Sequence, residues 1–323
     1  METECLSRPA QPSALRDASP APTYVAPFRE RVLGGARAAV GKGLGYEAQP
    51  VGGHFADAPL RGYFIDFRAK TTARTAATPA DLSPAALAQL ALGWWERAVS
   101  GEPDVLPRFV GTAELLRRRH NHALWAYEHD LPKYGLRAPW YSAMAQGQAA
   151  SVFARAARLS DDAADADLAI SALRPLLRRT TRSLVVQTPE GPVLEEAPSV
   201  RPSRILNGWI FALIGLWDVG EGLDDADSAR AFAAGVAALE RSLPLYDTGW
   251  WSRYSLYPHR LTDLAKPFYH RLHVAQLDAL HRVVGIEAFA KTSRRWAAYD
   301  SALPRACALT QKAAFRLLRG SSA

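Results

Sequence analysis

From about residue 80 onward the chain is a succession of amphipathic blocks of helical length, and this pattern limits the fold more than any other feature. In the first block, apolar side chains recur at three- and four-residue spacing from Leu87 to Trp95, as on one face of an α-helix. Ser83-Pro84 opens this block, and proline is favoured at the first helical position because the N–H that it lacks would have no partner there. Similar blocks follow at about residues 107–118, 140–159, 163–179, 203–221, 226–243, 266–284, 286–299 and 301–319. The sequence therefore predicts a mainly α fold.

Two short segments between these blocks have the pattern of β-structure. Residues 183–187 are rich in apolar and β-branched side chains and turn at Pro189-Glu190-Gly191 into residues 193–195, which predicts a β-hairpin. Residues 250–257 are a second candidate hairpin. Helices joined by short loops pack as neighbours. An α-solenoid is one such arrangement, although no repeat of fixed period is visible.

The first 79 residues differ in character from the rest. Prolines and glycine pairs interrupt residues 1–60, which predicts an irregular arm, and residues 62–67 form a run typical of one strand or an extended segment. We therefore divide the chain into an N-terminal arm with a short strand, residues 1–79, and a helical domain, residues 80–323. No apolar run has the character of a signal sequence or the length of a membrane span, so we expect a soluble, cytoplasmic protein.

Charge and cysteine content narrow the ligand classes. The net charge of +7 suits an anionic partner, but the 33 arginines and 6 lysines also match what a GC-rich coding sequence produces. There is no zinc finger, glycine-rich phosphate loop or aromatic ribonucleoprotein motif, so we expect no nucleic-acid partner. Cys5 and Cys307 lie near opposite ends and cannot build a disulfide framework or a multi-cysteine zinc site.

An aromatic pair, Trp140-Tyr141, leads into a helix of small residues that also carries Gln146 and Gln148. Buried amides need hydrogen-bond partners, so these two glutamines face either a cleft or the backbone of a neighbouring segment. Small side chains also allow helices to approach closely. The pattern therefore leaves open a ligand cleft and a tight helix crossing with internally satisfied amides.

An acid pair, Glu195-Glu196, ends the predicted hairpin shortly before an apolar helix that begins near Asn207. Neighbouring carboxylates raise one another's pKa, so this pair could supply a general base. A solvated acidic turn is the alternative. Asn207 adds a polar group where the apolar core should begin.

Residues 244–257 gather three tyrosines, two tryptophans and an arginine. Sugar rings present apolar C–H faces that stack on aromatic side chains, and tyrosine hydroxyls donate or accept hydrogen bonds beside them. This composition is typical of a carbohydrate surface, and buried aromatic packing is the alternative interpretation.

Tyr269, His273 and Gln276 are spaced by four and then three residues, so they share one face of the predicted helix at residues 266–284. His270 and His273 are also at helical spacing, as in some metal sites. No HExxH pattern or third acidic ligand accompanies them, so we expect no metal and histidines that are satisfied by hydrogen bonds within the fold.

Together these segments resemble, in order and spacing, the C-terminal domain of the heparosan D-glucuronyl C5-epimerase family. The blocks that carry the resemblance are Trp140 to Gln148, Leu206-Asn207-Gly208, Leu213 to Leu216, Leu245 to Gly249 and Tyr269 to Leu277. The resemblance covers roughly residues 80–300. It implies an α/α toroid, in which helical hairpins surround a central cleft, with short β-hairpins between helices.

Members of this family invert C5 of D-glucuronate residues in a polysaccharide, giving L-iduronate, as in heparan sulfate biosynthesis. The resemblance thus implies an epimerase acting on a glucuronate-containing polysaccharide such as heparosan, with no cofactor. By residue-wise carry-over, the catalytic groups are Tyr254, Tyr269, Glu195 and Glu196. The substrate-binding residues are Trp140, Tyr141, Gln146, Gln148, Asn207, Arg253, Tyr257, His270 and His273.

Two positions depart from the family pattern. Ala197 stands where the family has a tyrosine, and Tyr257 stands where an arginine would neutralise the substrate carboxylate. Arg253 or Arg260, on the same loop, could replace that arginine. These departures keep two other functions open, a polyuronate lyase that shares the C5 deprotonation step and a non-catalytic carbohydrate-binding relative. The oligomeric state is left open between a monomer and a homodimer.

Overall fold

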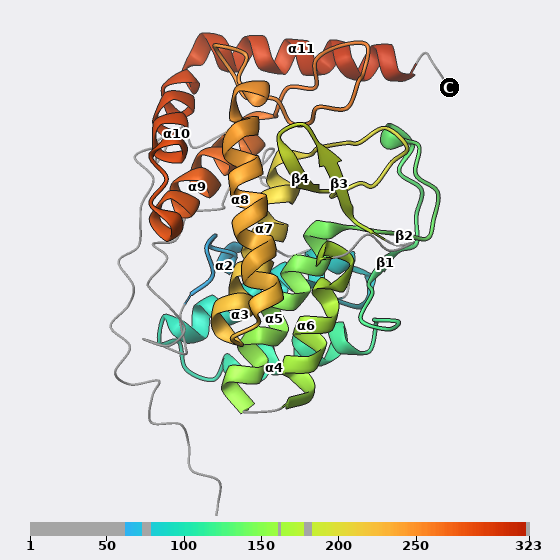
Figure 1. Cartoon of the computed structure of the whole chain (residues 1–323), viewed down its shortest axis with the longest axis vertical. Coiled ribbons are helices and arrows are strands. Elements are labelled where there is room, and N and C mark those ends of the chain that lie inside the picture. Colours follow the sequence, from blue (N-terminus) through green and yellow to red (C-terminus); the bar gives the residue numbers. More distant parts are fainter. Residues whose placement is uncertain (1–61, 73–78, 161–162, 178–182, 321–323) are drawn as a thin grey trace, which may run out of the picture.

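The computed structural model describes residues 62–72, 79–160, 163–177 and 183–320, and the arm predicted for residues 1–61 lies outside this part of the chain. The described residues form a mainly α structure (Figure 1). The helices are α2 (Arg68–Thr72), α3 (Pro84–Val99), α4 (Leu106–Arg117), α5 (Ala143–Ser160), α6 (Ala163–Leu177), α7 (Leu206–Gly222), α8 (Ala226–Tyr246), α9 (Pro267–Val284), α10 (Glu287–Tyr299) and α11 (Ala302–Gly320). Short 3-10 turns, η2 (Pro79–Asp81) and η3 (Pro132–Tyr134), lie in the connections. Every predicted helical block contains a helix, which confirms the fold class.

The described strands are short and form two antiparallel pairs. β1 (Ala126–Tyr127) pairs with β2 (Trp140–Tyr141), and β3 (Val185–Thr188) pairs with β4 (Gly191–Leu194). The second pair confirms the hairpin predicted at residues 183–195. Its turn ends at Gly191 with a φ of 123°, which glycine adopts without a steric penalty. No sequence pattern indicated the first pair.

The hairpin predicted at residues 250–257 is wrong, because this segment is a loop. The N–H of Tyr254 donates to the carbonyl of Asp263 at 2.7 Å, and the N–H of Leu256 donates to the carbonyl of Ser203 at 3.2 Å. Ser252 also forms an isolated bridge with Asp247, and Arg253 forms one with Leu264, so residues 250–257 pair with flanking segments and not as a hairpin of their own.

The helices pack in pairs along the chain, α3 with α4, α5 with α6, α7 with α8 and α9 with α10. Helices α3, α5, α7 and α9 also contact one another in succession. One helix of each pair thus lies inside and its partner outside, as in helical toroids and solenoids. Figure 1 shows α11 lying across the upper end of this arrangement.

The close contact between α5 and α7 explains why α5 begins with small residues. A Cβ built on Gly215 would lie 2.4 Å from the Cα of Gly147, so only glycine fits at this crossing. Arg155 of α5 and Asp218 of α7 form a buried ion pair in the same interface, with 2.6 Å between Nη1 and Oδ2. Removing one partner of a buried pair costs about 3–5 kcal/mol, so this pair specifies how the two helices meet.

The last part of the predicted arm packs on the helices. The side chains of Tyr63, Phe64 and Phe67 are buried, and the Phe64 ring meets Trp217 of α7 edge-on at a centroid distance of 5.0 Å. Residues 62–72 therefore contribute to the same hydrophobic core as α3, α5 and α7.

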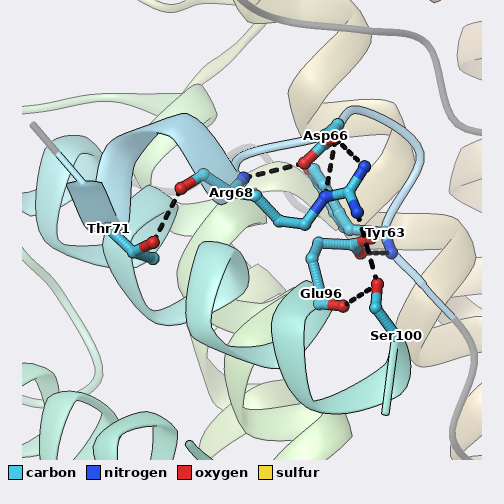
Figure 2. Close-up of polar contacts among 6 residues, drawn as sticks. All are labelled: Tyr63, Asp66, Arg68, Thr71, Glu96 and Ser100. Carbon is cyan, nitrogen blue, oxygen red and sulfur yellow. Dashed lines mark hydrogen bonds and ion pairs between the residues drawn. The ribbon is translucent and has the colours of Figure 1, made fainter. Parts of the chain in front are cut away.

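A buried carboxyl group attaches this segment to α3. Figure 2 shows Glu96 of α3 directed at the segment, where its carboxylate accepts the N–H of Tyr63. Beside it, Nη2 of Arg68 donates to Oδ2 of Asp66 at 2.6 Å, and the Ser100 hydroxyl donates to the Glu96 carbonyl at 2.7 Å. Burial, opposed by the Tyr63 N–H, raises the pKa of Glu96 to about 8.

Candidate functional site

Several connections meet beside the first turns of α7 and α9, in the upper part of Figure 1. They are η3, the residues after β4, the loop at residues 247–266 and the side of α11. The N–H of Leu206, at the start of α7, donates to the carbonyl of Tyr254 at 3.1 Å, so the loop is attached to the helix entry. This convergence brings together side chains from widely separated parts of the sequence.

Glu196, which follows β4, is half-buried at this meeting point. Nδ2 of Asn207 lies 3.4 Å from its Oε2. A Cβ built on Gly208 would lie 2.1 Å from the same oxygen, so the helix entry leaves room for the carboxylate only because glycine is there. Burial raises the pKa of Glu196 to about 7; the ammonium of Lys133 lowers it and the neighbouring Glu195 raises it. The group is therefore part ionised and part protonated near neutral pH.

Tyr254 and Tyr269 form a contacting pair in the same cluster. Their ring centroids are 4.9 Å apart at an interplanar angle of 64°, and both side chains are half-buried. Burial, reinforced by the charge of Glu196, raises the pKa of Tyr254 well above its usual value and that of Tyr269 to about 12. Both hydroxyls are therefore protonated at neutral pH and can act as proton donors.

A charged trio that sequence reasoning missed lies next to Tyr254. Nζ of Lys133, in η3, is 2.6 Å from Oδ2 of the buried Asp263, and Lys312 of α11 bonds the other carboxylate oxygen. The Lys133 ammonium also lies 4.6 Å from the centre of the Tyr254 ring, in cation–π contact. Burial alone would raise the pKa of Asp263, but the two ammonium groups outweigh it and lower that pKa. The one available sequence signal was the rarity of lysine, with six in the chain.

Glu195 has surroundings unlike those of Glu196. It is fully buried, and its Oε2 accepts the N–H and the hydroxyl of Ser203 at 2.8 and 2.6 Å. Its Oε1 accepts the N–H of Arg204 at 2.9 Å, at a residue with a left-handed φ of 48°. The predicted acid pair is therefore divided: Glu195 fixes the loop, while Glu196 faces the cluster of tyrosines and lysine.

The glutamines predicted to bind substrate lie in the core. Oε1 of Gln146 accepts the N–H of Trp125 at 3.0 Å, and its Nε2 donates to the carbonyls of Ala123 and Ala172, both at 2.8 Å. Oε1 of Gln148, also buried, accepts a hydrogen bond from Gln89 at 3.3 Å. The Gln146 amide thus satisfies three backbone groups in two neighbouring segments, residues 123–125 and α6.

The aromatic pair before α5 occupies β2. Trp140 stacks on Tyr127 with 4.2 Å between ring centroids, and its indole N–H donates to the carbonyl of His129 at 2.8 Å. Tyr141 is half-buried and pairs with Ala126 across the two strands. The pair lies on the side of the molecule that carries Tyr127, whose pKa is raised by burial and by the charge of Glu196.

His270 and His273 are buried around Ser252. Nε2 of His270 donates to the carbonyl of Trp296 at 2.9 Å, so its Nδ1 accepts the Ser252 hydroxyl at 2.8 Å. That hydroxyl in turn accepts Nδ1–H of His273 at 3.0 Å. Burial lowers the pKa of His270 to about 4 and that of His273 well below its usual value, so both rings are neutral. The histidines hold the loop that carries Tyr254.

The remaining predicted binding residues line the same loop. Nη1 of Arg253 donates to the carbonyl of Leu245 at 3.4 Å. Tyr257 is half-buried and meets the ring of Tyr134 edge-on at 5.3 Å. Ala197 is buried in the same small apolar cluster as Tyr134 and Tyr257, so a tyrosine at that position would require neighbouring rings to move.

Other features lie apart from this cluster. A cavity of about 610 Å³ between the end of α4 and α6, lined by Arg117, His120 and Arg174 among others, shares no lining residue with the Glu196 cluster. Across the described ranges, no helix is both long and apolar enough to cross a membrane. In the same ranges, no three histidine, cysteine or acidic side chains are placed to hold a metal ion.

Comparisons with known proteins identify the family of this chain. Residues 119–298, more than half of the chain, match the family described as the D-glucuronyl C5-epimerase C-terminus. The chain is 31% identical over 205 residues to a D-glucuronyl C5-epimerase of Caenorhabditis elegans, covering 57% of this chain and 33% of the nematode protein. An uncharacterised protein of Methanocaldococcus jannaschii is 26% identical over 190 residues, covering 57% of this chain and 60% of the archaeal protein. The match thus spans less than two thirds of either relative's length. The chain belongs to the D-glucuronyl C5-epimerase family.

Proposed function

We propose that this protein is an epimerase that inverts C5 of D-glucuronate residues within a polysaccharide, giving L-iduronate. The observation that carries the proposal is that Glu196, with a pKa of about 7, shares one half-buried cluster with the protonated Tyr254 and Tyr269. Family membership supports the same class of reaction.

The reaction needs two proton-transfer groups. The C5 proton lies α to the substrate carboxylate, and its removal breaks the C5–H bond and moves the electron pair into a C5–C6 enediolate with two negative charges. Delivery of a proton to the opposite face of C5 forms a new C–H bond and inverts the centre. A base on one face of the ring and an acid on the other therefore suffice.

In this proposal Glu196 is the base, because a carboxyl group with a pKa of about 7 is part ionised near neutral pH and is a stronger base than an exposed glutamate. The contacting tyrosines are the acid, since both hydroxyls carry protons. After one turnover Glu196 holds the former C5 proton and the tyrosine pair has lost one. Exchange with water restores both, so solvent hydrogen enters C5.

Incubation of the protein with heparosan and other uronate polymers in D2O tests the proposal. We expect deuterium at C5 and the appearance of iduronate, with no absorbance from unsaturated uronate. A rise in that absorbance would indicate a lyase, which expels the C4 substituent after the same first step. Binding without deuterium uptake from any uronate polymer would indicate a non-catalytic carbohydrate-binding protein. Either result contradicts the proposal.

A further inference from the structure

The charged trio of Lys133, Asp263 and Lys312 has a surplus of positive charge beside the proposed base and acid. Asp263 is fully buried and ionised, and each of its carboxylate oxygens is bonded by one ammonium group. Two lysines share this single carboxylate, so the trio carries a net charge of about +1 when both are protonated. The Glu196 carboxylate faces Lys133 when it is ionised, and this charge is lost once Glu196 takes up the C5 proton, so the site then favours the negative charge that develops on the substrate.

The two lysines are not equivalent. Lys312 donates to the carbonyl of Leu264 at 2.9 Å as well as to Asp263, so its ammonium is held by two acceptors. Lys133 donates to Asp263 and otherwise faces the rings of Tyr254 and Tyr134, at 4.6 and 4.8 Å. An ammonium group has three N–H donors, so Lys133 can hydrogen-bond a ligand without giving up Asp263. Its side chain is 15% exposed, so part of the side chain reaches solvent.

We propose that Lys133 is the catalytic cation that binds the uronate carboxylate of the substrate and stabilises its enediolate, and that Asp263 and Lys312 position it. The inference rests on the proposed function. Removal of the C5 proton places a second negative charge on the carboxylate oxygens, so an ammonium group there binds the transition state more tightly than the substrate.

This role accounts for the departure at position 257. Tyr257 packs edge-on against the ring of Tyr134, and the Lys133 ammonium lies 4.8 Å from the centre of that same ring. The ammonium therefore lies near Tyr257, the residue that stands where the family has an arginine. Nη1 of Arg253, a substitute considered from the sequence, donates to the Leu245 carbonyl at 3.4 Å. In this proposal the positive charge comes from Lys133 in η3, a different part of the chain.

The charges that face Lys133 come from three elements: Asp263 from the loop, Lys312 from α11 and Glu196 after β4. Burial, with a contribution from Lys312, lowers the pKa of Lys133 to about 8, although Asp263 and Glu196 oppose that shift. The ammonium charge is therefore lost as pH rises through about 8. Arginine keeps its charge in this range, so replacement of Lys133 by arginine distinguishes a charge role from a packing role.

The test compares Lys133→Met, Lys133→Arg and Lys291→Met. Lys291 is exposed on α10, outside the cluster, and controls for the loss of one positive charge. Two readouts are measured: deuterium uptake at C5 of heparosan, and binding of heparosan relative to the same polymer with its carboxyl groups reduced to alcohols. Thermal unfolding of each variant reports folding.

We expect Lys133→Met to lower kcat/KM for exchange about 100- to 1000-fold, as for loss of one group that stabilises an oxyanion. The wild type should prefer heparosan over the reduced polymer by at least about 10-fold, and Lys133→Met should abolish this preference. Lys133→Arg should retain the preference, and its kcat/KM should no longer fall above pH about 8. Lys291→Met should match the wild type.

The proposal is overturned if Lys133→Met keeps both exchange and the carboxylate preference within about twofold of the wild type. If Lys133→Met does not fold, the Lys133→Arg pH profile decides, and an unchanged alkaline limb overturns the proposal. If no uronate polymer shows exchange with the wild type, the epimerase function fails by itself. The preference for heparosan over the carboxyl-reduced polymer then still tests whether Lys133 recognises the carboxylate. If the wild type shows no such preference, the proposal for Lys133 is rejected as well.

Discussion

Glu96 and Glu196 are two glutamates with similar electrostatics and very different surroundings. Burial raises the pKa of Glu96 to about 8 and that of Glu196 to about 7. Glu96 is 2% exposed, and its carboxylate accepts a backbone N–H that attaches residues 62–72 to α3. Glu196 is half-buried and lies among two tyrosines and a lysine.

A raised pKa therefore marks desolvation and does not by itself mark a functional group. Glu96 is almost completely buried, and its carboxylate bonds a backbone N–H. Glu196 is half-buried, with the hydroxyl pair of Tyr254 and Tyr269 as proton donors and the ammonium of Lys133 beside it. We therefore expect changes around Glu96 to affect stability and changes around Glu196 to affect turnover.

Among the neighbours of Glu196, the tyrosines should give the largest effect. Tyr254→Phe and Tyr269→Phe each remove a proton donor and should lower C5 deuterium exchange about 100- to 10000-fold, with little change in glycan binding. Tyr63→Phe removes a buried hydroxyl from the residue beside Glu96 and serves as the matched control. Loss of exchange in Tyr63→Phe as large as in the other two variants would break the comparison.

A smaller effect should follow from crowding Glu196 without changing its chemistry. In Gly208→Ala the new methyl group would lie 2.1 Å from Oε2 and 2.5 Å from Cβ of Glu196, so the side chain must move. We expect exchange to fall about 100-fold, because a displacement of about 1 Å in a reacting group can cost that much. Gly111→Ala on α4, where the added Cβ meets nothing within 4 Å, is the control. Equal activity of both variants would show that the position of the Glu196 carboxylate does not matter.

The smallest expected effect is on the pH dependence of stability, and here Glu96 and Glu196 should behave alike. Each has a folded-state pKa above the unfolded value of about 4.3, so the folded state binds more protons than the unfolded state between these values. The stability contribution is fully present below about pH 4.3 and is lost as pH rises, up to about 7 for Glu196 and about 8 for Glu96. Urea unfolding at several pH values should show a weaker pH dependence in Glu96→Gln and in Glu196→Gln. An unchanged slope in either variant would reject the assigned protonation of that group.

The helices could be predicted because their signal is local. The three- and four-residue spacing that marks one face of α3 or α7 needs no knowledge of the partner helix. The loop at residues 250–257 was predicted wrongly because an aromatic-rich composition does not identify the hydrogen-bond partner, which here is supplied by residues such as Asp263.

The candidate site was only partly predictable from the sequence. The grouping of Tyr254, Tyr269 and the acid pair came from a family resemblance, and the structure shows that Glu195 and Glu196 have different surroundings. Lys133 and Asp263 are 130 residues apart in sequence, so no local pattern connects them. Gln146 illustrates the same limit, since its burial among backbone partners depends on three segments that meet only in the fold.

The role of Glu196 as the base is tested most directly by C5 deuterium uptake in Glu196→Gln and Glu96→Gln, measured side by side with heparosan in D2O. Glu196→Gln should lose exchange at least about 1000-fold, because glutamine cannot accept the C5 proton, while Glu96→Gln should stay close to the wild type. Retention of exchange by Glu196→Gln, or an equal loss in both variants, would contradict the assignment of Glu196 as the base.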